Sequence, residues 1–84
     1  MTPSDAAPGP GPVLMWEIKA ATGQIEALTS WVAEHAAATA QVFRSEDRVV
    51  VLDPTGRAEQ DLAGLPRELA DRPAHAWTFR PVPR

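Results

Sequence analysis

The sequence predicts an α+β fold in which two helices cover one face of a four-stranded antiparallel sheet. The prediction depends on the order of the hydrophobic periodicities and on one polar turn. Strand-like alternation is found at residues 13–20, 41–45, 49–53 and 75–82, and helix-like spacing at 24–38 and, in broken form, at 59–71. The resulting β-α-β-β-α-β order is typical of the split βαβ motif. In such a sheet, the face opposite the helices needs cover from elsewhere.

The first predicted strand and helix each carry one clearly apolar side. Alternate residues of the strand are apolar throughout: Leu14, Trp16, Ile18 and Ala20. We expect this set to lie under the helices. The helix carries an apolar stripe at 3.6-residue spacing, made of Ile25, Leu28, Val32 and Ala36. Trp31 lies beside the stripe, four residues before His35, so that the two rings can make contact.

A polar turn at residues 45–48 joins two short β-branched or aromatic runs and predicts a hairpin. In the expected register Phe43 pairs with Val50 and, on the opposite face, Val42 pairs with Val51. Both faces of the hairpin therefore carry large apolar side chains. A sheet with one face in water would alternate more cleanly, so the second face is expected to be covered.

Proline and glycine mark the remaining boundaries. The sequence Asp53-Pro54-Thr55-Gly56 suits a type I turn that ends the third strand. Gly64 and Pro66 interrupt the second helical segment, and Pro66 suits the start of a new helical turn. The prolines at 81 and 83 suit an edge strand, which is the place of the last strand in this topology.

Size and composition limit the classes of function. The chain has 84 residues, a formal net charge of −3 and no cysteine, which excludes disulfides, zinc–thiolate sites and a cysteine nucleophile. The eight Lys and Arg residues are scattered, so we expect no nucleic-acid partner. Because neither a secretory signal nor a membrane-length apolar run is visible, we expect a soluble cytoplasmic protein without membrane contact. Arginine outnumbers lysine seven to one, which is typical of GC-rich bacterial genomes.

Residues 1–12 are predicted to form a disordered tail before a single domain at residues 13–84. The tail holds four prolines and two glycines and has no apolar periodicity, so it cannot bury enough surface to offset the entropy of ordering. The remaining domain is small enough for its single core to be only marginally stable. Oligomerisation is a common remedy at this size.

From Val13 to Val82 the order of elements resembles the ferredoxin-like superfamily, and in particular its dimeric α/β-barrel branch, in which two open sheets pack face to face. That branch includes cofactor-independent antibiotic-biosynthesis monooxygenases, chlorite-dismutase-like haem proteins, muconolactone isomerases and stress-responsive barrel proteins. The resemblance implies a ferredoxin-like βαββαβ sandwich that forms a homodimer through the open sheet face. As an alternative function, it implies a cofactor-independent monooxygenase or isomerase acting on an aromatic or polyketide-like substrate.

Three tryptophans are candidates for a ligand pocket, because aromatic rings can line a site for a flat molecule. Trp16 and Trp77 are instead expected in the core, since they belong to adjacent strands with matching apolar faces. Trp31, on the flank of its helix, remains a candidate for ligand binding or for an interface.

Charged residues form a second group of candidates. Glu17 and Arg80 are expected on neighbouring strands, on the face away from the helices, with Lys19 and Arg44 on the same face. A carboxylate beside cations can bind an anionic ligand or transfer a proton. The alternative, which we favour, is a salt bridge at a dimer interface.

His35 and His75 are the two side chains whose ordinary titration range lies near neutral pH. They are candidates for acid–base chemistry, but their spacing favours ordinary surface histidines and predicts no metal site. No cofactor is expected either, since the chain contains no glycine-rich phosphate loop outside the tail.

No nucleophile, base and oxyanion donor can be assembled from this sequence, which favours a small non-enzymatic binding or accessory module. We expect it to act as a homodimer through an apolar free face that contains Met15, Val42, Val49 and Val51. If the protein is monomeric, a different protein partner is expected there. The candidate interface or ligand-binding residues are Glu17, Trp31, His35, Arg44 and Arg80.

Overall fold

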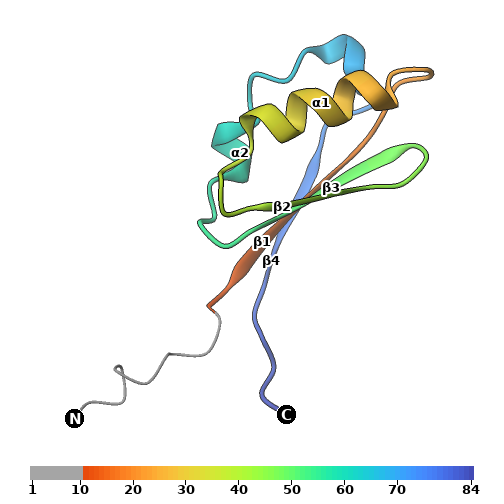
Figure 1. The fold of residues 1–84 in the computed structure, drawn as a ribbon. Coiled ribbons are helices and arrows are strands. Elements are labelled where there is room, and N and C mark those ends of the chain that lie inside the picture. The colour runs from red at the N-terminus through yellow and green to blue at the C-terminus, as the bar shows by residue number, and fades with distance from the viewer. Residues whose placement is uncertain (1–10) are drawn as a thin grey trace.

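The computed structural model describes residues 11–84 and shows a four-stranded antiparallel sheet with helices on one face (Figure 1). The elements follow in the order β1 (Val13–Lys19), α1 (Ile25–His35), β2 (Gln41–Arg44), β3 (Arg48–Asp53), α2 (Ala58–Asp61), a 3-10 helix η1 (Arg67–Leu69) and β4 (His75–Phe79). The strand order β2-β3-β1-β4 is that of the ferredoxin-like βαββαβ fold and confirms the predicted class. Most of the predicted tail, residues 1–10, lies outside the described residues, so its disorder stays a prediction.

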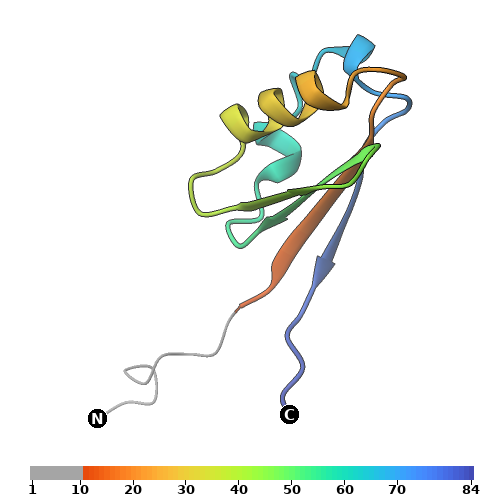
Figure 2. The ribbon, with the colours of Figure 1, turned by 45° about the vertical axis from the view of Figure 1, so that its right-hand side comes forward.

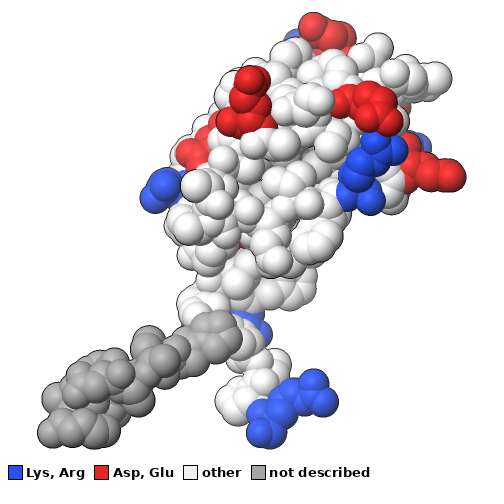
Figure 3. All heavy atoms as spheres, viewed as in Figure 1, with Lys and Arg blue, Asp and Glu red and all other residues white. Residues whose placement is uncertain are grey.

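The helical layer covers a single side of the sheet. Figure 2 shows α1, α2 and η1 on the same side of all four strands. Of the helices that the structure describes, none combines the length and apolar character needed to cross a bilayer. On the surface seen in Figure 3, acidic side chains lie over this helical layer and basic ones are scattered.

The hairpin has the predicted register, with Phe43 opposite Val50 and Val42 opposite Val51. Its orientation is decided by β1, because Trp16 pairs with Val51. Val51 therefore points to the same side as the buried Trp16, under the helices. The same pairing places Val42 and Val49 on the helix side, so the prediction that these three valines form the free face is wrong.

The last strand is oriented by its pairing with β1. Trp16 lies opposite Ala76, and Met15 lies opposite Trp77. Directly opposed residues share a face, so Trp77 points away from the helices and is 47% exposed, whereas Trp16 is 3% exposed. The prediction of a core position is confirmed for Trp16 and wrong for Trp77. The strand also ends at Phe79 rather than at Val82.

The core forms where α1 crosses the middle of the sheet. Leu28 and Val32, one helical turn apart, are fully buried, as are Val49 and Val51 of β3 below them. The α1 helix ends at His35, three residues earlier than predicted, because Ala36 has extended backbone angles (φ −68°, ψ 154°). The second crossover adds two further buried residues to this core, Ala58 and Leu62.

The second crossover contains much less helix than the first. The α2 helix has four residues and η1 has three, against eleven in α1. Pro66 precedes η1 with extended angles (φ −60°, ψ 131°), in agreement with the break predicted there. Two short pieces cannot cover the sheet as fully as one long helix, and a cavity remains beneath them.

Asp53 is a buried carboxylate at the end of β3, with 1% of its surface exposed. Its Oδ1 atom accepts hydrogen bonds from the backbone N–H and the hydroxyl of Thr55 (2.8 and 2.7 Å), and Oδ2 accepts one from the N–H of Arg57 (2.9 Å). Burial alone would raise the pKa of Asp53, but these hydrogen bonds outweigh it and hold that pKa below its usual value. Gly56 completes the predicted turn with φ +73°, which glycine adopts without strain. Asp53 thus stabilises a turn.

Candidate functional site: the open face of the sheet

The face of the sheet opposite the helices, here called the open face, is built from alternate residues of all four strands. In β1 and β3 these are the partly exposed residues that alternate with buried ones. The strand pairings then place the following residues on this face: Val13, Met15, Glu17 and Lys19 of β1; Gln41 and Phe43 of β2; Arg48, Val50 and Leu52 of β3; His75, Trp77 and Phe79 of β4.

Most of the open face is apolar. Met15 lies in the centre, with Leu52 opposite it on one side and Trp77 on the other. Phe43, Trp77 and Phe79 are the large side chains of this surface, and each is about half exposed (50%, 47% and 53%). The apolar patch, as we call it below, consists of Val13, Met15, Phe43, Val50, Leu52, Trp77 and Phe79. A contiguous apolar surface of this kind usually marks an interface.

A charged cluster of Glu17, Arg48 and His75 borders the apolar patch. Arg48 donates a hydrogen bond from Nη1 to Oε2 of Glu17, and His75 Nδ1 lies 3.8 Å from Oε1 of the same carboxylate. The Glu17 side chain is only 15% exposed. The hydrogen bond to Glu17 raises the pKa of Arg48 above its usual value. Glu17 is therefore held in an ion pair instead of standing free as a general base.

The position of Glu17 on this face was predicted, but its partner was not. Arg80 follows the end of β4, whereas Glu17 pairs with His75 at the beginning of that strand, so Glu17 and Arg80 do not meet. The sequence interpretation missed Arg48 because this residue was assigned to the turn. Its position just before a β-branched run was the signal that could have placed it in the strand.

Arg44 was predicted on the open face and lies on the helix side instead. It pairs with the buried Val49, and its Nη1 atom donates a hydrogen bond to Oε2 of Glu26 on α1 (2.9 Å). Successive residues of a strand point to opposite faces. Because Phe43 lies on the open face, its neighbour Arg44 lies on the helix side.

Trp31 and His35 make the predicted contact on α1. Their rings stack with centroids 3.9 Å apart and an interplanar angle of 13°, and His35 Nδ1 lies 2.8 Å from the carbonyl oxygen of Trp31. This pair is on the helix side of the sheet, and His75 is on the open face. The two histidines are therefore not brought together. Trp31 and His35 also lie on the opposite side of the sheet from the charged cluster.

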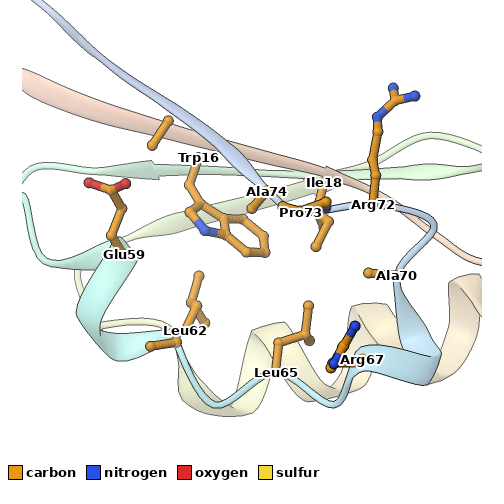
Figure 4. Close-up of a pocket in the computed structure, with 12 residues that line it drawn as sticks. Trp16, Ile18, Glu59, Leu62, Leu65, Arg67, Ala70, Arg72, Pro73 and Ala74 are labelled. Carbon is orange, nitrogen blue, oxygen red and sulfur yellow. The ribbon is translucent and has the colours of Figure 1, made fainter.

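A cavity of about 440 Å³ lies on the helix side, between the sheet and the second crossover, which contains α2 and η1 (Figure 4). None of the five candidate residues predicted from the sequence lines it. Its walls come from β1, β4, α2 and η1 and from the loops beside them: Trp16, Ile18, Glu59, Leu62, Ala63, Leu65, Arg67, Ala70, Arg72, Pro73, Ala74 and Ala76. The volume lies within the range of small-molecule sites.

Comparison with known proteins finds one kind of similarity. The chain is 36% identical over 62 residues to protein PhoH of Escherichia coli K12, and equally to protein PhoH of Escherichia coli O157:H7. The matched stretch is 74% of this chain but 17% of either PhoH protein. No family model matches the chain. No solved structure matches it either.

Proposed function

We propose that this protein is a small non-enzymatic binding module that acts as a homodimer through the open face of its sheet. The observation that carries the proposal is the apolar patch, in which Phe43, Trp77 and Phe79 are each about half exposed. A patch on one sheet can pack against the same patch of a second copy around a two-fold axis, since such an interface needs only to be complementary to itself. Sheets that pack face to face place their side chains in a layer about 10 Å thick.

The charged cluster is compatible with burial at such an interface. Covering a charged group is costly unless it is already paired and hydrogen-bonded. Glu17 meets that condition inside one chain, because it accepts a hydrogen bond from Arg48 and lies near His75. A second copy can therefore cover this region without supplying a charge of its own.

Two further observations favour a binding module. The domain is small, so an interface would add stability that the monomer lacks. The similarity to a short stretch of a much longer protein also supports a domain that can work as one part of a larger assembly.

The alternative function, a cofactor-independent monooxygenase or isomerase, stays a prediction. Within residues 11–84, neither Glu17, Trp31 nor His35 lines the cavity in which such a reaction would take place. The residues that do line it are mostly apolar, and no serine, threonine or histidine is among them.

The proposal is tested by replacing Trp77 with lysine and measuring the molar mass by light scattering after size exclusion at micromolar concentration. We expect the unmodified protein to be a dimer and Trp77→Lys to be a monomer with an unchanged circular dichroism spectrum. Val82→Lys is the matched control, because Val82 is 77% exposed but lies outside the apolar patch. It should remain a dimer.

A monomeric unmodified protein at this concentration would overturn the homodimer. A dimer that survives Trp77→Lys as well as Phe43→Lys would also overturn it, because the contact would then lie elsewhere.

A further inference from the structure

The cavity on the helix side is independent of the open face and of the proposed dimer. It exists because the crossover from β3 to β4 forms only two short helical pieces, α2 and η1. Under this crossover lie small side chains, Ala76 of β4 and Ala74 just before it, next to the large indole of Trp16. A longer helix or larger β4 side chains would fill this space.

The body of the cavity is apolar. The indole of Trp16 lies in the middle of the view in Figure 4, with Leu62 and Leu65 opposite it and Ile18 beside it. Trp16 is 3% exposed, so packing against other core residues holds its side chain in place. A flat or branched apolar group placed here would lie against an aromatic ring and aliphatic side chains, which commonly line ligand sites.

Charged side chains stand at the ends of the cavity. Figure 4 shows Glu59 at the end near α2 and Arg67 at the end near η1, while Arg72 points away. Arg44 and Arg48 each have a carboxylate partner. Within the described part of the chain, no carboxylate lies within ion-pair distance of Arg67, and the same is true of Arg72. A guanidinium group offers paired N–H donors that match the geometry of a carboxylate.

We propose that this cavity binds a small apolar or aromatic carboxylate. The apolar part of the molecule lies against Trp16, Leu62 and Leu65, and its carboxylate points toward Arg67. Glu59 at the other end disfavours the reverse orientation, because its carboxylate would repel the carboxylate of the ligand. The cavity thus selects for one acidic group at one end of an apolar body.

The test compares 1-naphthoate with its neutral analogue 1-naphthamide. Both are titrated into the full-length, isotopically labelled protein, and binding is followed by proton–nitrogen NMR. We expect the naphthoate to shift the indole N–H signal of Trp16 and the amide signals of Ala70 and Ala76. The naphthamide should bind about tenfold more weakly, which corresponds to about 1.4 kcal/mol.

Two variants assign the site and the charge. Ala76→Leu fills the cavity from β4 and should abolish the shifts at Trp16. Arg67→Gln should leave the fold intact, because Arg67 is exposed, and should remove the preference for naphthoate over naphthamide. Arg44→Gln is the matched control, since it removes an arginine outside the cavity, and should bind like the unmodified protein.

Three results would overturn the proposal. The first is that Trp16 does not shift at millimolar naphthoate. The second is that the shifts are confined to Trp77 and its neighbours on the open face. The third is that Arg67→Gln retains the preference for the carboxylate.

Discussion

The two faces of the sheet have similar apolar character and opposite surroundings. On the covered face Leu14, Trp16 and Ile18 are at most 7% exposed. On the open face Trp77 and Phe79, of comparable size, are about half exposed. The difference is that a helical layer lies on one side only (Figure 2). Apolar side chains on a strand therefore do not identify the inside of this protein; the position of the helices does.

The largest expected effect comes from the same substitution made on the two sides of the sheet. Leu28→Ala, on α1 in the core above the covered face, should lower the free energy of unfolding by about 3 kcal/mol, because it removes a fully buried side chain and leaves a cavity. Leu52→Ala, on the open face, should cost about 1 kcal/mol in the monomer, since its side chain is only partly buried. Urea unfolding at low protein concentration measures both.

Protein concentration sharpens this comparison. If the open face forms a dimer interface, the cost of Leu52→Ala should grow as the concentration rises, because the dimer stabilises the folded state by mass action. The cost of Leu28→Ala should stay constant. Equal costs for both variants at low concentration would mean that the two faces are equally buried in the monomer.

Asp53, the buried charged residue on the covered side, should have the next largest effect. Asp53→Ala removes the acceptor of three hydrogen bonds and should cost about 2 kcal/mol. The folded-state pKa of Asp53 lies below the usual 3.8, so its contribution is fully present above that value and is lost as pH falls through the folded-state pKa. The unfolding free energy of the unmodified protein should therefore fall more steeply below pH 4 than that of Asp53→Asn. Parallel pH profiles would contradict this role.

Substitution of Glu17 tests whether the charged cluster lies within the contact of the proposed dimer. Glu17→Ala removes the partner of Arg48, and in a dimer it would leave this guanidinium unpaired within an interface. We expect the dissociation constant of the dimer to rise about tenfold, because an unpaired charge is costly once water is excluded. Analytical ultracentrifugation measures the change. An unaltered dissociation constant would place the charged cluster outside the contact.

The smallest effect is expected for Arg44→Ala. The ion pair between Arg44 and Glu26 lies at the sheet edge, with side chains 37% and 85% exposed. Exposed pairs of this kind contribute about 0.5 kcal/mol or less, and salt screens them. Urea unfolding at low and high salt should show almost no difference from the unmodified protein, and the dimer should be unaffected. A loss comparable to that of Asp53→Ala would show that Arg44 has a larger structural role.

Local patterns along the chain were enough to predict the features that depend on neighbouring residues. The order of strands and helices follows from local periodicity. The hairpin register, with Phe43 opposite Val50, follows from one polar turn. The contact between Trp31 and His35 follows from their separation by one helical turn. In each case the residues involved are close along the chain, so few alternatives compete.

Which face each strand presents to the helices depends on pairing between segments that are distant in the sequence. Alternation shows that His75, Trp77 and Phe79 share a face, but not which face, because a strand fits the sheet with either side inward. That choice came from pairing with β1, more than fifty residues earlier in the sequence, where Trp77 lies opposite Met15. Long-range pairings also place Arg44 on the helix side and bring Arg48 next to Glu17. The cavity, too, forms between segments distant in sequence, and so no local pattern predicts it.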